Sequence, residues 1–321
     1  MRAIVVTRHG GPEVLELQDV PAPEPGPGQL LVGVEAAGVN FRDIYERKGG
    51  GPYEAETPHL AGVEGAGTVA AVGEGVEGFA QGDRVAWCEG QGSYAEQVLV
   101  SADAAVPVPE GIATDVAAAA MLQAATAHYL ATSTYPIQPG DTVIVHAAAG
   151  GVGLLLTQIA KRRGGRVIAT TSSDEKAQLA RGAGADETIG YEGFAERARE
   201  LTDGEGVAAV YDGIGATTFD ESLAALRPRG FMVLYGAASG QPPAVEISKL
   251  NAGSLFLTRP TLAHHGREGD ELRMRAADFL GWIAAGELVV RIGGRYPLED
   301  AARAQADLAS RATTGKLLLV P

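Results

Sequence analysis

The hydrophobic pattern changes its period partway along the chain. Up to about residue 120, short apolar runs are separated by turns rich in glycine and proline, a pattern typical of antiparallel β structure. The predicted strands of this part are 3–6, 14–17, 29–34, 67–72, 84–87 and 95–100. Two segments, 38–47 and 62–67, interrupt the strand pattern and bring polar groups together. We therefore predict an antiparallel β domain that carries a concentration of polar residues in these two segments.

From residue 142 onward, short β-branched runs alternate with segments of helical period, which favours a parallel sheet covered by helices. The predicted strands are 142–146, 166–171, 187–189, 207–211, 231–235 and 254–257, with helices at 154–161, 192–202 and 219–226. An alanine-rich helix at 115–132 precedes them. Six strands alternating with helices suit a doubly wound sheet. After helices near 270–285 and 298–310, we expect the tail 316–320 to return to the first domain, because the sheet already has its six strands.

The strand 142–146 and the helix after it are joined by a bend of small residues, AAAGGVG at 147–153. The first N–H groups of a helix have no partner inside the helix, and the missing side chains let a pyrophosphate approach them. The pattern is Ala147-x-x-Gly150-x-x-Gly153, which departs from the full three-glycine fingerprint. An ordinary turn of a parallel sheet is the alternative. The strands on both sides favour dinucleotide binding.

The end of the second strand indicates which dinucleotide binds. An NAD enzyme usually has an acidic side chain there for the ribose hydroxyls, whereas this chain has TTSS at 170–173. Neutral hydroxyls tolerate an added 2′-phosphate, and Lys176 follows one helical turn later with a positive charge. The alternative is that Ser173 only caps the helix that begins at Asp174, with Lys176 in solvent. The acidic pair 174–175 weighs slightly against the phosphate, but NADP(H) is favoured overall.

Composition narrows the class of protein. A chain of 321 residues with 45% apolar content and no apolar run of membrane length suggests two globular domains without a membrane span. No signal-peptide pattern opens the sequence, so the cytoplasm is expected. Cys88 is the only cysteine, which excludes an internal disulfide and a Cys-rich zinc site, and we expect it to be a small buried residue. A net charge of −14 disfavours nucleic acid as a partner.

Motifs along nearly the whole chain resemble the NADPH:quinone oxidoreductases, the zinc-free, zeta-crystallin-like branch of the medium-chain dehydrogenase/reductase superfamily. They are HGGPEVL at 9–15, GVNFRD at 38–43, GVEGAG at 62–67, GDRV at 82–85, HAAAGGVG at 146–153, TRP at 258–260 and SRATTGK at 310–316. The resemblance implies an α/β protein with a GroES-like antiparallel β catalytic domain and a Rossmann domain with a doubly wound parallel sheet. The implied limits are 1–122 for the catalytic domain, 123–262 for the NADPH-binding domain and 263–321 for the C-terminal return. A homodimer is also implied.

The resemblance also implies which residues form the site. Asn40 and Tyr45 would be catalytic, beside the nicotinamide, where an amide or a phenol can hydrogen-bond a developing oxyanion. For Tyr45 a packing role is the alternative, and Asp43 could serve only to orient the loop backbone. Arg259 and Arg311 could instead form salt bridges. The implied NADPH-binding residues are Asn40, Phe41, Asp43, Tyr45, Thr126, Gly150, Gly151, Val152, Ser172, Ser173, Lys176, Tyr191, Tyr235, Gly236, Ser239, Thr258, Arg259, Arg311, Gly315 and Lys316.

No metal is predicted. The zinc alcohol dehydrogenases of the superfamily use a cysteine and a histidine where the resemblance puts Asn40 and Val63 in this chain, and the four-cysteine loop of their structural zinc is absent. Glu64 alone cannot hold zinc, which needs three or four ligands. The adjacent pair at 264–265 cannot supply two histidine ligands from one element, and we expect it in a solvated loop.

Three functions fit these residues, in order of preference. The first is NADPH-dependent reduction of quinones, because a quinone already accepts hydride strongly and mainly has to be held against the nicotinamide. The second is reduction of activated carbon–carbon double bonds in enals, enones or enoyl thioesters, which needs a proton donor that Tyr45 could be. The third is an NADPH-binding protein without turnover, as among crystallin-type relatives. The expected partner is a small quinone or another conjugated electrophile.

Overall fold

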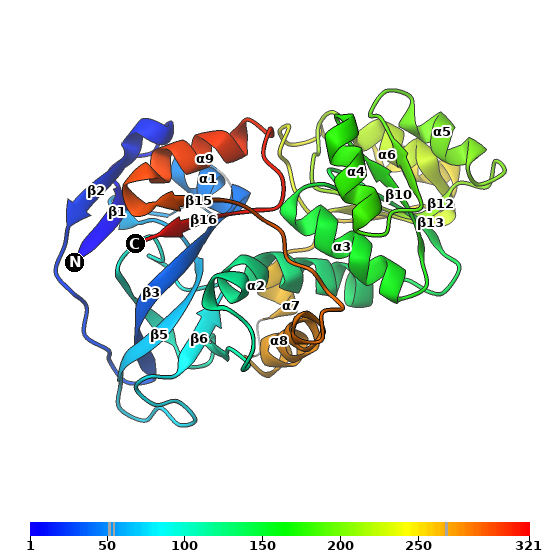
Figure 1. The fold of residues 1–321 in the computed structure, drawn as a ribbon. Coiled ribbons are helices and arrows are strands. Elements are labelled where there is room, and N and C mark those ends of the chain that lie inside the picture. The colour runs from blue at the N-terminus through cyan, green and yellow to red at the C-terminus, as the bar shows by residue number, and fades with distance from the viewer. Residues whose placement is uncertain (51–52, 54, 267–268) are drawn as a thin grey trace. The chain divides into compact units, whose positions relative to one another are not determined.

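The computed structural model describes residues 1–50, 53, 55–266 and 269–321, and its internal contacts divide the chain into two compact units (Figure 1). The first unit comprises residues 1–123 and 268–321, and the second comprises residues 124–267. Each unit has a sheet and a core of its own. The domain limits implied by the resemblance stay a prediction.

The first unit is built on antiparallel strands. β1 (Arg2–Val6) pairs with β2 (Leu15–Asp19) and β4 (His59–Leu60) in a small sheet. A seven-stranded sheet has the order β15-β16-β3-β5-β6-β8, with β7 paired to β3. Its strands are β3 (Gln29–Val39), β5 (Glu64–Val72), β6 (Arg84–Trp87), β7 (Gln97–Ser101), β8 (Val106–Pro107), β15 (Ile292–Pro297) and β16 (Lys316–Val320). The predicted antiparallel β domain is confirmed.

The C-terminal tail completes this sheet. β16 runs antiparallel to β3, with Leu318 opposite Gly38, and parallel to β15. Leu317 and Leu319 of the tail join the core of the unit together with Val39 and Trp87. Helices α8 (Gly269–Ala284) and α9 (Ala301–Ala309) belong to this part of the chain. The pairing of β16 with β3 places residue 316 beside the carboxyl end of β3.

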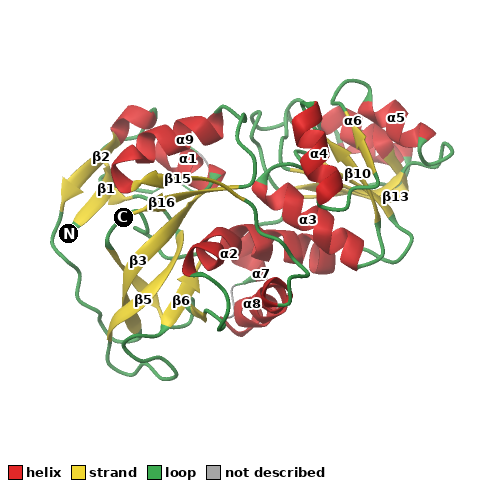
Figure 2. Cartoon of the chain, viewed as in Figure 1, coloured by secondary structure: helices red, strands yellow, loops and turns green. Residues whose placement is uncertain are grey.

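The second unit is a parallel sheet with the strand order β11-β10-β9-β12-β13-β14. The strands are β9 (Thr142–Val145), β10 (Arg166–Thr170), β11 (Glu187–Ile189), β12 (Val207–Asp212), β13 (Leu226–Leu234) and β14 (Phe256–Thr258). They alternate with helices α3 (Gly151–Arg162), α4 (Asp174–Gly182), α5 (Phe194–Glu200) and α6 (Phe219–Ala225), as Figure 2 shows. The order reverses at β9, which is the doubly wound arrangement that the hydrophobic pattern predicted.

Some elements differ from the prediction. Helix α1 (Phe41–Lys48) begins inside the first polar segment, and α2 (Thr114–Tyr129) ends in a π-helical turn (Leu130–Thr134). The expectation of a solvated loop at 264–265 is wrong. These histidines end the short helix α7 (Leu262–His265), where the ring of His265 stacks on Tyr129 with centroids 4.3 Å apart. A stacking partner 136 positions earlier in the sequence, which the local pattern does not show, holds this segment in place.

Two further observations concern the predictions made from composition, for Cys88 and for membrane spans. Cys88 is buried, as expected of a small apolar residue. None of the helices in the described part of the chain is both long enough and apolar enough to cross a membrane.

Candidate cofactor and active sites

The bend between β9 and α3 has the geometry of an anion site. Gly150 is the N-cap residue of α3 in an extended conformation, and no side chain caps the helix there. The N–H groups of the first turn, which begins at Gly151 and Val152, therefore remain available to a ligand. A β-carbon on Gly153 would overlap the carbonyl oxygen of Ala147 and lie 2.7 Å from the α-carbon of Ala148. Glycine is thus required at this position for the bend to pack against the helix.

A buried histidine, His146, directly precedes the bend, and both of its ring nitrogens contact hydroxyl groups. The Nδ1 atom of His146 lies 2.8 Å from the hydroxyl of Thr170, and Nε2 lies 2.9 Å from the hydroxyl of Ser222. The ring is fully buried, and this loss of solvent lowers the pKa of His146 to about 4. The imidazole is therefore neutral at pH 7. It joins the carboxyl ends of β9 and β10 to helix α6.

Tyr191, one of the implied NADPH-binding residues, contacts the same bend. Its hydroxyl accepts the N–H of Ala147 at 3.1 Å, and its ring lies against His146 with centroids 6.2 Å apart. Ala147 has a φ of 48°, in the left-handed region that non-glycine residues seldom adopt. The hydroxyl of Tyr191 thus satisfies a backbone N–H at the strained position of the bend.

Asp212, at the end of β12, extends this buried network. Its carboxylate accepts the N–H groups of Ile214 and Gly215 at 2.7 and 3.0 Å and the hydroxyl of Thr218 at 2.7 Å. The hydroxyl of Ser222 lies 3.4 Å away. Sequence reasoning identified none of Asp212, Thr218 and Ser222 as site residues. The available signal was an aspartate directly after a buried apolar strand, at the sheet edge where ligands bind.

The residues predicted for the 2′-phosphate lie together at the end of β10. Ser173 caps α4 by accepting the backbone N–H of Lys176 at 3.3 Å, and the ammonium of Lys176 donates to the hydroxyl of Ser172 at 3.2 Å. Both serines are exposed and Lys176 is half-buried. Capping and phosphate binding are compatible here, because the cap uses the backbone N–H of Lys176, while its ammonium lies on the hydroxyl of Ser172.

The predicted residues after β13 and β14 are held by backbone contacts. The N–H groups of Tyr235 and Gly236 donate to the carbonyl of Asp212, and Arg259 donates to the carbonyl of Leu234 at 3.2 Å. Burial raises the pKa of Tyr235, so its phenol stays protonated. Thr258 is the last residue of β14, and Thr126 is buried in α2.

Ser239 lies in the turn after β13. Its hydroxyl donates to the carbonyl of Ile214 at 2.8 Å and accepts the N–H of Thr217 at 3.1 Å. These predicted residues of the second unit therefore follow β9, β10, β13 and β14, at the carboxyl ends of these parallel strands.

In the first unit, the predicted residues gather at the start of α1. The backbone N–H of Asn40 donates to Asp43 Oδ2 at 2.8 Å, and the hydroxyl of Tyr94 donates to the same oxygen at 2.7 Å. Burial raises the pKa of Asp43 to about 6. Asp43 thus orients the start of the helix, as its alternative role suggested. The half-buried rings of Phe41 and Tyr45 lie with centroids 6.3 Å apart on the same helix.

The side chain of Asn40 belongs to a second buried cluster. Its Nδ2 group donates to Glu64 Oε2 at 2.7 Å and to the carbonyl of Gly38 at 3.3 Å, and its Oδ1 accepts from the ammonium of Lys316 at 2.6 Å. Lys316 also pairs with Glu64 Oε2, and the N–H of Leu122 donates to Glu64 Oε1 at 2.6 Å. The side chains of Lys316 and Glu64 are 0% exposed. The resemblance placed Lys316 among the cofactor contacts, whereas its ammonium faces the interior of this unit.

Arg311 and Gly315 lie in the loop before β16. Both have positive φ, of 60° and 66°, and Arg311 is exposed. A β-carbon on Gly315 would overlap the carbonyl oxygen of Arg291. Gly315 therefore has a packing reason of its own, apart from any role toward a cofactor.

These residues do not fit zinc. One carboxylate oxygen of Glu64 pairs with the Lys316 ammonium, and the other accepts the backbone N–H of Leu122. Asn40 and Val63 provide neither a thiolate nor an imidazole. Within residues 1–50, 53, 55–266 and 269–321, no group of three or more His, Cys, Asp or Glu side chains is placed to hold a metal ion.

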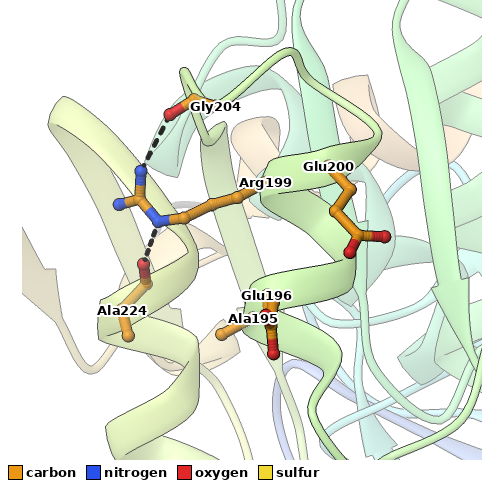
Figure 3. A pocket seen from close by; sticks show the side chains of 6 residues that line it. All are labelled: Ala195, Glu196, Arg199, Glu200, Gly204 and Ala224. Atoms are coloured by element: carbon orange, nitrogen blue, oxygen red, sulfur yellow. Dashed lines mark hydrogen bonds between the residues drawn. The ribbon is translucent and has the colours of Figure 1, made fainter.

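One surface hollow of the second unit, of about 470 Å³, lies elsewhere, between α5, α6 and the turn after α5 (Figure 3). Arg199 crosses it and donates to the carbonyls of Ala224 and Gly204 at 2.9 and 3.0 Å. It contains none of the predicted site residues. Its arginine satisfies free carbonyls at the end of a helix, which is a structural role.

Comparison with known proteins finds relatives that match the chain over its full length. The model of the alcohol dehydrogenase GroES-like domain matches residues 26–110, and that of the zinc-binding dehydrogenase matches residues 151–282. A quinone oxidoreductase of Pseudomonas aeruginosa is 44% identical over 100% of this chain and 99% of its own. A 2-haloacrylate reductase of a Burkholderia species is 39% identical over 99% and 98% of the two chains.

A mycobacterial protein solved in complex with NADPH is 51% identical, with 100% of both chains covered and a TM-score of 0.97. The strand order, the uncapped glycine bend and the full-length identities together show that the chain belongs to the quinone oxidoreductase family of the medium-chain dehydrogenase/reductase superfamily.

Proposed function

We propose that this protein reduces quinones with NADPH. The observation that carries the proposal is a pair of features at the carboxyl ends of the parallel strands. The first is the uncapped helix start at Gly150, and the second is the Lys176 ammonium on the hydroxyl of Ser172, where an NAD enzyme has an acidic side chain. The first feature suits a pyrophosphate and the second suits a 2′-phosphate. The names of the full-length relatives support a quinone as the acceptor.

Bound NADPH supplies the hydride, and one proton from solvent or the protein completes the quinol. The protein's contribution is mainly to hold a flat electrophile in place, since a quinone accepts hydride without a Lewis acid. We propose that the residues implied by the resemblance, apart from the buried Lys316, form the cofactor site, with the bend on the pyrophosphate and the end of β10 on the 2′-phosphate of the adenosine. Asn40 and Tyr45, both near the start of α1, are the proposed catalytic residues.

The test is oxidation of NADPH, followed by its absorbance, with a simple benzoquinone and with a conjugated enone in parallel. NADH and an excess of chelator serve as controls. Turnover of the quinone with NADPH, unchanged by the chelator, is the expected result. Loss of activity on chelation, or stoichiometric zinc in the purified protein, would contradict the proposal of a metal-free reaction.

A second function is favoured by one specific relative. The 2-haloacrylate reductase matches the whole chain, and its name indicates an activated double bond as its substrate. Reduction of such a bond requires a proton at the α-carbon, and the half-buried phenol of Tyr45 is the proposed donor. Turnover of the enone without turnover of the quinone would move the assignment to this reaction. Binding of NADPH with neither turnover would favour a non-enzymatic role.

We also propose a homodimer formed through β14. This strand lies at the edge of the six-stranded sheet and pairs with β13 on one side. Phe256 on β14 is 49% exposed and the nearby Ile247 is 80% exposed. An edge strand with apolar side chains is a template for pairing with a second chain.

A further inference from the structure

The cluster of Asn40, Glu64 and Lys316 is unusually well defined for a buried group of polar side chains. Asn40 follows β3, Glu64 opens β5 and Lys316 opens β16, so three strands of one sheet contribute one residue each. Their exposures are 4%, 0% and 1%. The single ammonium and the single carboxylate balance each other in charge. A buried pair of this kind is costly to desolvate, and packing alone is a weak reason for having one.

The ammonium determines how the amide of Asn40 is turned. Lysine offers donors only, so the atom of Asn40 that faces it at 2.6 Å has to be the acceptor Oδ1. The Nδ2 group then points to Glu64 and to the carbonyl of Gly38. Exchanging the two ends of the amide would put its N–H donors against the ammonium. The backbone N–H of Asn40 is fixed separately by Asp43. The residue is held by both its backbone and its side chain.

The strand pairing leaves space for the lysine stem. Gly38 lies opposite Leu318 in the β3–β16 ladder, two positions beyond Lys316. A β-carbon on Gly38 would lie 2.6 Å from Lys316 Cε and would overlap Glu64 Oε2. The absence of a side chain at position 38 is therefore a condition for this cluster to form.

We propose that Lys316 is a positioning residue for the reaction, which acts by fixing the amide of Asn40 and makes no contact with the quinone itself. This inference rests on the proposed function, in which Asn40 lies beside the reacting groups. It also assigns a role to Glu64, whose carboxylate holds both the ammonium and the amide. A small displacement of a group that contacts reactants can lower a rate by roughly 100-fold, so the position of the amide matters as well as its presence.

The variants have to separate positioning from stability. Lys316→Met alone leaves the Glu64 charge buried without its partner, and such a charge is strongly destabilising. The informative variant is Lys316→Met with Glu64→Gln, which removes both charges and keeps an oxygen for the N–H of Leu122. Lys249→Met with Asp220→Asn is the matched control, because it removes an exposed pair with a 2.7 Å contact in the second unit.

The experiment is a mutant cycle. The kcat and KM for a benzoquinone are measured for the wild type, for Asn40→Ala, for the double variant and for the protein that combines all three substitutions. We expect Asn40→Ala and the double variant each to lower kcat by roughly 10- to 100-fold. The combination should be no slower than the slower of the two, because Lys316 acts through Asn40. For the double variant, the dissociation constant of NADPH, measured by its fluorescence, should stay within about twofold of the wild-type value. The surface control should match the wild type in kcat, KM and this dissociation constant.

Two results would overturn the inference while leaving the proposed function in place. One is multiplication of the two rate losses in the combined variant, which would show independent effects. The other is a fully active double variant with unchanged kcat and KM. If the wild-type protein turns over no quinone at all, the proposed function itself fails. A double variant that unfolds at assay temperature is measured below its melting temperature, so that the cycle still decides.

Discussion

At the scale of single residues, the proposed role of Lys176 in the preference for NADPH can be tested. Its ammonium lies 3.2 Å from Ser172 Oγ at the end of β10. We expect Lys176→Ala to raise the dissociation constant of NADPH about ten- to hundredfold, because a charge-assisted hydrogen bond contributes roughly 1.5 to 3 kcal/mol. NADH binding should be nearly unchanged. Calorimetric titration with both cofactors checks this, with Lys249→Ala as the control, and an equal loss for both cofactors would contradict the assignment.

The buried imidazole of His146 makes stability depend on pH. Its pKa is lowered from 6.5 to about 4 in the folded protein, so the unfolded chain binds the proton more readily between these values. The free energy of unfolding therefore falls as the pH falls from 7 to 5, with about 2 kcal/mol from this group. Asp43, with its pKa raised to about 6, acts in the opposite direction over part of this range.

Comparison with a variant separates the two groups. Denaturant unfolding of the wild type and of His146→Gln at pH 7 and 5 leaves the Asp43 contribution common to both proteins. The wild type should lose about 2 kcal/mol more than the variant on acidification. Parallel pH dependences would show that the imidazole is not buried in its neutral form.

The local sequence was sufficient to predict the contacts of some of these residues and insufficient for others. The cap at Ser173 and the position of Lys176 follow from a pattern of four neighbouring residues, and the contacts agree with it. The contact between His146 and Ser222 joins residues 76 positions apart, and that between Asn40 and Lys316 joins residues 276 apart. Nothing in the local pattern indicates such pairs, so the family resemblance named Lys316 without revealing that it faces inward.

At the scale of elements, the start of α3 can be tested through its glycines. We expect Gly153→Ala to destabilise the protein by about 1 to 3 kcal/mol, because the new methyl group would overlap the backbone of the bend. The same shift should weaken NADPH binding, since the bend carries the donors. Gly182→Ala at the end of α4 is the matched control: it meets no atom within 4 Å and should stabilise slightly. Thermal unfolding and cofactor titration of both variants test this prediction. A Gly153→Ala protein with unchanged stability and unchanged NADPH affinity would contradict it.

The predictability of an element depended on how regular its pattern is. β9, β10 and β12 are buried runs of apolar residues, and the sequence located them to within one residue. α1 and β15 were not predicted. α1 has eight residues, several of them charged, and β15 contains two glycines and alternates between half-buried and exposed positions. Both are stabilised by packing within the first unit, which outweighs a weak local preference.

At the scale of the whole molecule, strands far apart in the sequence meet in one sheet. β16 pairs with β3, so residues 316–320 belong to the sheet of the first unit. The sequence indicated this return through the count of strands in the parallel sheet, which was already six without the tail. The arrangement brings Lys316 of the tail to Asn40, which is the contact that the proposed positioning role requires.

The proposed dimer is also a property of the whole molecule, and the edge strand β14 provides its test. We expect the wild type to have the mass of a dimer in sedimentation equilibrium, and Phe256→Lys to raise the dimer dissociation constant by 100-fold or more, about 2.7 kcal/mol. A charge on an edge strand opposes pairing with a second strand. Phe256 stacks on Phe231 within its own sheet, and its side chain is still 49% exposed. Met274→Lys, at a position 52% exposed on α8 of the other unit, is the control and should remain dimeric. A monomeric wild type would refute the dimer, and a dimer that Phe256→Lys leaves intact would place the interface away from β14.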